Sequence, residues 1–246
     1  MMQDFWSFFT FPLNLFLAVL WIVGWVWLWK NKSSSAAVRF LLSPTATISS
    51  FILLLAAGLW IGFSSNTSIV HSVPFVLALL YIQTVVFMVT LRGWRRPCGA
   101  VRWRFLLIHA GFLLAIGAAF WGAPDSSELR VQLAQGETTQ IAYEMDSSIV
   151  GLGYELELND YKTEYSKSGQ PQHYEAIVSI DGGESVAITV NHPYNVRFGE
   201  DIYLTSVSDK GCVLQIIHEP WRYFALAGII MLLAGAFMLF IGGPKR

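Results

Sequence analysis

The sequence is short of charge, and acidic residues are missing from a long part of it. Asp, Glu, Lys and Arg make up 13% of the 246 residues, whereas about 25% is usual in soluble domains. Between Asp4 and Asp125 there is no Asp or Glu at all. This absence excludes paired carboxylates for acid–base catalysis from the first half of the chain.

Cysteine is also scarce, and the motifs of several enzyme classes are missing. The chain has two cysteines, Cys98 and Cys212, with no CxxC and no Cys/His spacing that suits a metal. Neither a Ser/His/Asp order nor a phosphate-cradling glycine loop is present. We therefore expect no enzyme activity from this chain by itself.

Apolar residues are abundant instead. They make up 54% of the chain, and the mean hydropathy is +0.49. Five apolar runs are long enough to cross a bilayer as helices, because an open strand in lipid would leave its backbone polar groups unpaired. The predicted spans are Leu13–Trp29, Ile48–Phe63, Val73–Leu91, Phe105–Gly122 and Tyr223–Ile241.

Charges on either side of these spans predict the topology. Basic residues collect in Lys30–Arg39, in Arg92–Arg104 and at Lys245–Arg246, and the positive-inside rule places these segments in the cytoplasm. Sixteen of the seventeen acids lie in Asp125–Glu219, which then falls outside. We expect a bacterial cytoplasmic-membrane protein with its N-terminus outside and its C-terminus in the cytoplasm. The acidity of the external segment also argues against a nucleic-acid partner.

The external segment, residues 124–219, has the alternating pattern of β-strands. In GYELELNDY (Gly153–Tyr161), apolar and polar residues alternate with period 2. Asp181-Gly182-Gly183 lies between two such runs and predicts a hairpin. The seven predicted strands are Leu129–Ala134, Thr139–Tyr143, Gly153–Tyr161, Tyr174–Ile180, Ser185–Val190, Asp201–Val207 and Val213–His218.

The pattern as a whole predicts a membrane α+β protein. About five transmembrane helices carry an extracytoplasmic antiparallel β-sandwich, which is inserted between the fourth and fifth helices. The expected parts are an extra N-terminal helix with a basic linker (1–40), a three-helix core (41–123), the β domain (124–219) and a last helix (220–246).

His109 is the residue of most interest, because it is an ionisable side chain inside a predicted span. One reading is structural, with the ring bonded to a backbone carbonyl or to a serine of a neighbouring helix. The other is axial ligation of haem iron, since imidazole is a normal haem ligand. Small residues such as Gly111, Gly117 and Ala118 make the helix thin, so that a flat macrocycle or another helix could approach it. His71, at the outer end of the third span, is a weaker candidate for the same role.

Several segments of the chain, and the order in which they follow one another, resemble the ResB family of cytochrome c biogenesis proteins, also called CcsB. The family's external signature is similar to Ile188–Pro193 followed by Gly199–Tyr203. The full resemblance runs through Leu41–Phe63, Phe105–Gly122, Leu129–Thr138, Gly169–Ser206 and Glu219–Phe240. The external domain is shorter than is usual in the family, and the first helix is additional.

The resemblance implies a haem-delivery role. With a CcsA-like membrane partner, the chain would bind haem b and support its attachment to apocytochrome c. His109, which lies in the matching helix, would be an axial ligand of the haem iron, and the second ligand would come from another polypeptide. Two other readings stay open: an electron-transfer subunit, which needs two axial ligands and a redox partner, and a structural assembly partner that holds no haem.

Overall fold

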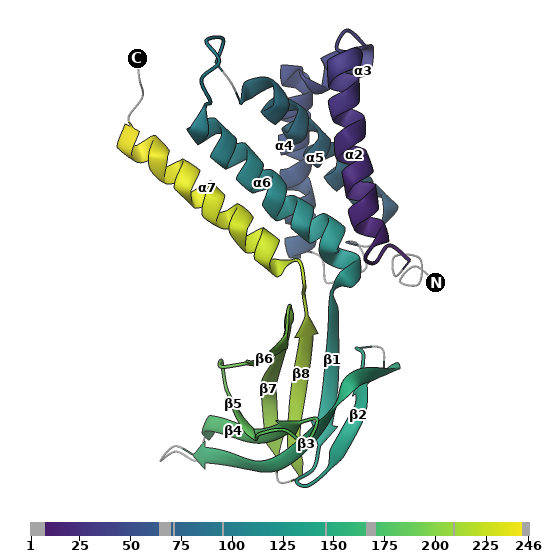
Figure 1. Ribbon diagram of the computed structural model, residues 1–246, viewed down its shortest axis with the longest axis vertical. Coiled ribbons are helices and arrows are strands. Elements are labelled where there is room, and N and C mark those ends of the chain that lie inside the picture. Colours follow the sequence, from purple (N-terminus) through teal and green to yellow (C-terminus); the bar gives the residue numbers. More distant parts are fainter. Residues whose placement is uncertain are drawn as a thin grey trace. The chain divides into compact units, whose positions relative to one another are not determined.

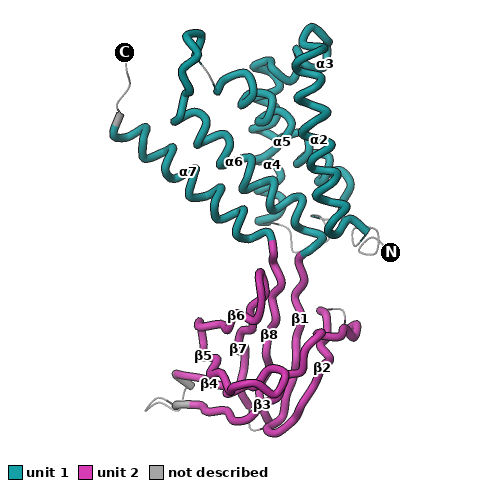
Figure 2. Tube along the Cα trace, viewed as in Figure 1, with its two compact units in different colours: residues 1–125, 221–246 teal, residues 126–220 magenta. Residues whose placement is uncertain are grey.

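The structure is a computed structural model that describes residues 8–63, 70, 72–94, 96–145, 147–165, 171–208 and 210–242. Its contacts divide the chain into two compact units (Figure 2). Unit 1 combines Met1–Asp125 with Trp221–Arg246, and unit 2 is Ser126–Pro220.

Unit 1 is helical (Figure 1). Among the described residues, five helices are long and apolar enough to cross a membrane, as the sequence predicts. A short helix, α3, and a 3₁₀ turn, η2, accompany them. The elements are α2 (Leu13–Asn31), α3 (Ala36–Leu41), α4 (Pro44–Phe63), α5 (Val73–Gly93), α6 (Trp103–Gly122), η2 (Ala123–Asp125) and α7 (Arg222–Gly242).

The segment Lys32–Ser43, which includes the predicted basic linker, contains helix α3. The Ser35 side chain caps this helix by accepting a hydrogen bond from the backbone N–H of Val38 at 3.3 Å. Val38 and Leu41 are buried in a cluster with Ala46 of α4 and with residues of α5. The short helix therefore closes the end of the bundle at which α2 finishes.

Helices α6 and α7 pack together without side chains between them at two glycines. A Cβ placed on Gly111 would lie 2.7 Å from the carbonyl oxygen of Gly228 and 2.8 Å from the amide nitrogen of Leu232. Such distances leave no room for any other residue type. Close backbone approach at small residues is the usual way in which helices associate in lipid.

Unit 2 is an antiparallel sheet of eight strands (Figure 1), which agrees with the predicted membrane α+β class and inserted β domain. Seven strands correspond to the predicted runs, and β6 was not predicted. The strands are β1 (Ser127–Leu133), β2 (Thr138–Tyr143), β3 (Ile149–Tyr165), β4 (Pro171–Ile180), β5 (Val186–Thr189), β6 (Tyr194–Arg197), β7 (Glu200–Ser208) and β8 (Gly211–His218).

The strands form one continuous hydrogen-bonded sheet, in the order β5-β4-β3-β2-β1-β8-β7-β6. This sheet folds over, so that β4 and β5 contact β7, from which they are distant in the hydrogen-bonding order. The two halves of one sheet thus provide the two layers expected of a sandwich. Their inner faces enclose a core that includes Leu133, Leu156, Leu158, Val178, Ile188, Ile202, Leu214 and Ile216.

The predicted hairpin joins β4 to β5. Asp181 and Gly182 both have positive φ, at 51° and 67°, and the backbone N–H of Gly183 donates to the carbonyl oxygen of Ile180 at 2.9 Å, which closes a tight turn at the end of β4. The Asp181 side chain also accepts a hydrogen bond of 2.8 Å from the backbone N–H of Glu155 on β3. The turn therefore fixes β4 and β5 in register and attaches them to the neighbouring strand.

Candidate functional site

His109 lies on the first half of α6 and is half-buried. Its Nδ1 is 2.9 Å from the carbonyl oxygen of Phe105, one turn earlier on the same helix. The two rings are stacked, with centroids 3.9 Å apart and planes 24° from parallel. One hydrogen bond and one stacking contact therefore hold the imidazole in a defined orientation.

The contact with Phe105 determines which ring nitrogen of His109 is left for a ligand. A carbonyl oxygen only accepts hydrogen bonds, so Nδ1 carries the proton and donates it. The lone pair of the neutral ring is then on Nε2. In the described part of the chain, Nε2 has no hydrogen-bond partner. This arrangement of one anchored and one available nitrogen is the usual state of a metal-ligating histidine.

Phe105 is itself held from two sides. The guanidinium of Arg102 lies 4.9 Å from its ring centroid, which is within the range of a cation–π contact. Arg102 Nη1 also donates to the carbonyl oxygen of Gly93, at the end of α5, at 3.3 Å. A Cβ on Gly93 would meet the Phe105 ring, so a larger residue there would displace this ring. Arg102, Phe105 and His109 thus form a row of supported side chains along the start of α6.

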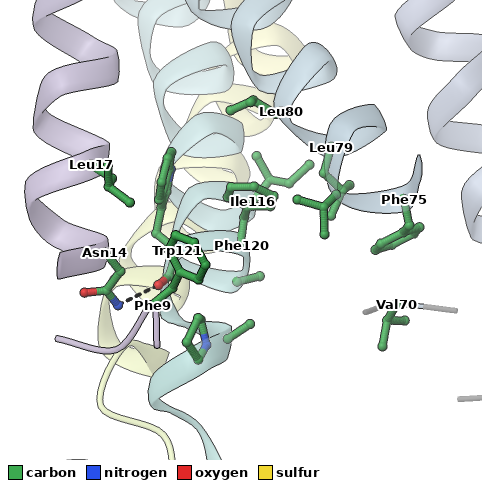
Figure 3. A pocket seen from close by; sticks show the side chains of 14 residues that line it. Phe9, Asn14, Leu17, Val70, Phe75, Leu79, Leu80, Ile116, Phe120 and Trp121 are labelled. Carbon is green, nitrogen blue, oxygen red and sulfur yellow. Dashed lines mark hydrogen bonds between the residues drawn. The ribbon is translucent and has the colours of Figure 1, made fainter. Parts of the chain in front are cut away.

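Two hollows lie among the helices of unit 1. The first, of about 490 Å³, is shown in Figure 3. Its polar side chain is Asn14, which donates to the carbonyl oxygen of Trp121 and to Asp125, both at 2.7 Å. Both donors of the Asn14 amide are therefore in use, and the hollow offers an apolar wall. It is lined by Phe9, Asn14, Leu17, Val70, Phe75, Val76, Leu79, Leu80, Ile116, Ala119, Phe120, Trp121, Ala123 and Pro124.

The second hollow has a volume of about 410 Å³ and lies among α2, α5, α6 and α7. It includes the residue that follows His109, Ala110, and the buried amide of Gln83. The lining is Leu15, Ala18, Val19, Trp21, Ile22, Gln83, Phe87, Thr90, Ala110, Leu113, Leu114, Gly117, Ala118, Trp121, Trp221 and Phe224.

Unit 2 contains a polar cluster that the sequence did not indicate. Glu200 is 4% exposed, and its Oε2 accepts hydrogen bonds from Arg197 Nε at 3.1 Å and Nη2 at 2.8 Å. His218 Nδ1 lies 3.2 Å from the same oxygen. The pKa of Tyr154 is raised well above its usual range, mainly because the hydroxyl is buried and secondly because the Glu200 carboxylate lies beside it. The cluster joins β3, β6, β7 and β8, so its contacts stabilise one end of the sheet.

Residues 99–213 match the family model described as the ResB-like family. The matched segment begins before α6, includes His109, and ends within β8. Residues 99–213 belong to the ResB-like family.

Two further proteins are similar to this chain. The cytochrome c biogenesis protein CcsB of Synechococcus sp. (strain CC9902) is 27% identical over 191 residues, which cover 70% of this chain and 44% of the relative. The chain thus spans less than half the length of that curated relative. A solved structure of the cytochrome c haem lyase CcmF aligns with 94% of this chain and 46% of its own, at 15% identity and a TM-score of 0.43.

The chain is a multi-pass membrane protein, as the five apolar helices among its described residues and its likeness to CcsB indicate. His109 is the predicted site residue that the structure describes, whereas His71 lies outside the described residues. Within the described ranges, no group of three or more His, Cys, Asp or Glu side chains could hold a metal ion. Among the described residues, His109 therefore has no neighbouring side chains that would complete a metal site made by this chain alone.

The sequence reasoning missed three groups that the structure brings forward: Gln83, the Asn14–Asp125 pair and Glu200. Gln83 carried a signal, since it is a polar side chain near the middle of a predicted span. Asp125 carried one as well, because it is the first acid after a gap of about half the chain. Glu200 is one acid among sixteen in the external segment, and its burial depends on how the sheet folds.

Proposed function

We propose that this ResB-like chain is a cytochrome c assembly factor of the bacterial cytoplasmic membrane. With a CcsA-like membrane partner, it binds haem b as cargo and delivers it outward for covalent attachment to apocytochrome c. The biogenesis role follows from the ResB-like segment and from the name of the relative CcsB. The haem role rests on His109.

The observation that carries the proposal is the state of the His109 ring. Nδ1 is anchored to the Phe105 carbonyl oxygen, so that Nε2 presents a lone pair from a side chain with restricted rotation. A histidine with a purely structural role needs only the first of these contacts. An available Nε2 suits axial ligation of iron, the part of haem chemistry that a single imidazole can provide. Arg102, two turns earlier, would offset the negative charge of the haem carboxylates.

The chain supplies one axial position, so the proposal requires a second subunit. The part of the chain that the structure describes has no other histidine in a membrane-spanning helix. Six-coordinate haem would then take its other ligand from the CcsA-like partner. Since each subunit would supply only one axial ligand, each would have to break only one bond to the iron when the haem is released.

The ligand role predicts a spectroscopic result. In the complex purified from membranes with its partner, His109→Ala should reduce bound haem, measured by its absorption band, by at least tenfold. His109→Gly should behave alike, and added imidazole should restore the band, because free imidazole can occupy the vacated axial position. His192→Ala, at an exposed histidine of unit 2, is the matched control and should keep normal haem.

Three results separate this proposal from its rivals. Unchanged haem and normal cytochrome c levels in His109→Ala would contradict the ligand role and favour a structural partner. Loss of haem with normal cytochrome c levels in a strain that lacks the protein would favour electron transfer. Loss of both, with imidazole rescue of His109→Gly, supports delivery.

The proposed orientation predicts how the two cysteines react. Cys98 is exposed and lies in the loop proposed to be cytoplasmic. Cys212 is buried in unit 2, and burial raises its pKa to about 11, so that little thiolate forms at neutral pH. In right-side-out spheroplasts, a membrane-impermeant maleimide should label neither. Permeabilisation should expose Cys98, and only denaturation should expose Cys212.

The labelling experiment has an internal control. Glu184→Cys places a thiol on an exposed position of unit 2, which should react in intact spheroplasts. Labelling of Cys98 before permeabilisation, or protection of Glu184→Cys, would show that the orientation is reversed.

A further inference from the structure

Gln83 is a buried amide with an unsatisfied donor in the middle of a membrane helix. It stands ten residues from each end of α5, Val73–Gly93. Its side chain is 1% exposed, and its Nε2 is buried with no hydrogen-bond partner within the described structure. An amide left unpaired in an apolar medium costs roughly 2–7 kcal/mol. A partner that the chain itself does not supply would remove this cost.

Three other polar side chains around the second hollow have their donors in use. Trp21 Nε1 donates to Thr84 Oγ1 at 3.2 Å, and Trp221 Nε1 donates to Asp125 at 2.6 Å. The hydroxyl of Thr90 donates to the carbonyl oxygen of Val86 at 2.7 Å. The amide of Gln83 and the indole N–H of Trp121 thus remain to offer a ligand a hydrogen bond in this apolar hollow.

Gly117 and tryptophan rings line the hollow beside Gln83. A Cβ on Gly117 would lie 4.0 Å from Gln83 Oε1 and 3.9 Å from the Trp121 ring, both ordinary contact distances. Trp121 and Trp21 lie on the same hollow, with ring centroids 6.4 Å apart. A space of about 410 Å³ is in the range of small-molecule pockets. Its volume and its apolar lining suit an apolar ring that carries a hydrogen-bonding oxygen.

The position of Gln83 at the middle of its helix limits which membrane molecules could reach its side chain. The hydrocarbon core is about 30 Å thick, so the ester carbonyls of phospholipids lie about 15 Å from its centre. They do not reach a residue at the midpoint of the helix. A helix of a partner protein, about 10 Å across, is too wide for a hollow in which Gln83 is already covered. A small ring ketone dissolved in the hydrocarbon core could reach this depth and is narrower than a helix.

We propose that this hollow binds a membrane-soluble quinone, whose ring lies against Gly117 and whose carbonyl oxygen accepts a hydrogen bond from Gln83. The terminal torsion of glutamine is broad, so the amide can turn Nε2 toward the ligand at low cost. The reduced form would donate its hydroxyl to Oε1 of the same amide. The proposal concerns binding alone, and it is independent of the haem role of His109.

A titration of the purified full-length chain in nanodiscs tests the site. Quinones quench tryptophan fluorescence on contact, and Trp21 and Trp121 line the hollow. Decyl-chain ubiquinone should quench the emission saturably. Gln83→Leu should weaken its Kd about tenfold, because one hydrogen bond is lost. Gly117→Leu should abolish saturable quenching by filling the hollow.

Two variants make the experiment decisive. Gly58→Leu, at a position with no atom within 4 Å of its Cβ, is the matched control and should bind like the wild type. His109→Ala should also keep the quinone Kd, and Gln83→Leu should keep bound haem, so that failure of one proposal is visible without the other. Gln83→Leu removes an unpaired amide and is expected to fold.

Three outcomes would overturn the proposal. The first is quenching that is unsaturable or equal in the wild type, Gln83→Leu and Gly117→Leu. The second is a phospholipid retained in native mass spectra of the wild type and lost from Gln83→Leu, since the occupant would then be a lipid. The third is loss of quinone binding in His109→Ala with Gln83 intact.

Discussion

Replacing Gly228 with leucine should prevent the membrane unit from folding. A Cβ at Gly228 would lie 2.6 Å from the amide nitrogen of Ala115 and 2.7 Å from the carbonyl oxygen of Gly111. These are backbone atoms of α6, so no rotamer change can move them aside. The two helices would have to separate, at a cost of at least about 3 kcal/mol.

The Gly228 contact has counterparts along the α6–α7 interface. Gly111 faces α7 in the same way, and a Cβ on Gly235 would meet Ile108 of α6. Separating the helices at Gly228 would therefore also break the contacts at Gly111 and Gly235. Since packing, and not the hydrophobic effect, associates helices in lipid, this interface has little else to hold it.

The Gly228→Leu prediction is checked by the yield of monodisperse protein in mild detergent and by its resistance to protease. Gly58→Leu adds the same side chain to α4, where a Cβ meets nothing within 4 Å, and should behave like the wild type. A Gly228→Leu protein with wild-type yield and protease resistance would mean that α6 and α7 are not packed at this glycine.

The small residues of α6 could be recognised from the sequence, but the neighbours that they contact could not. The sequence indicated that small residues would let either a macrocycle or another helix approach. Gly111 serves the second purpose, because the backbone of α7 lies against it. Gly117 is on another side of the helix, beside the second hollow. Composition alone could not assign these glycines to different partners.

Strands were predictable where they are long and alternate. In β3, Leu156 and Leu158 are fully buried as their period-2 pattern indicates. The missed strand β6, Tyr194–Arg197, is four residues long, lies at the sheet edge and has no fully buried residue. The pairing of β1 with β8 joins strands from the two ends of the domain, which periodicity does not report.

The candidate site was predictable in residue type but not in geometry. An ionisable side chain within an apolar run is recognisable from the sequence, and His109 was identified in this way. Its anchoring by Phe105 follows from the i−4 spacing only once the ring orientation is known. Gln83 could not be ranked from sequence, because its significance lies in the absence of a partner for Nε2, a property of the packed helices.

Asp125→Ala should be the second most damaging change in the membrane unit. The carboxylate accepts three hydrogen bonds from segments far apart in the sequence. The donors are the backbone N–H of Phe11 at 2.7 Å, Asn14 Nδ2 at 2.7 Å and Trp221 Nε1 at 2.6 Å. Alanine would remove all three bonds at once and leave partly buried donors unpaired. We expect a loss of roughly 3 kcal/mol.

The expected consequence is release of the first helix. Asn14, which is 2% exposed, holds α2 to the end of α6 through its bonds to Trp121 and Asp125. Without the carboxylate, one Asn14 N–H is unpaired in an apolar site, which weakens the contact between α2 and α6. Protease cleavage between α2 and α4 should become faster, and the unfolding temperature in detergent should fall.

Two comparisons decide whether the Asp125 effect arises from these three bonds. Asp125→Asn keeps one acceptor oxygen and should lose about half as much stability. Glu184→Ala removes an exposed acid from unit 2 and should leave the unfolding temperature unchanged. If Asp125→Ala were as stable as Glu184→Ala, the three bonds to the carboxylate would not be what holds the first helix in place.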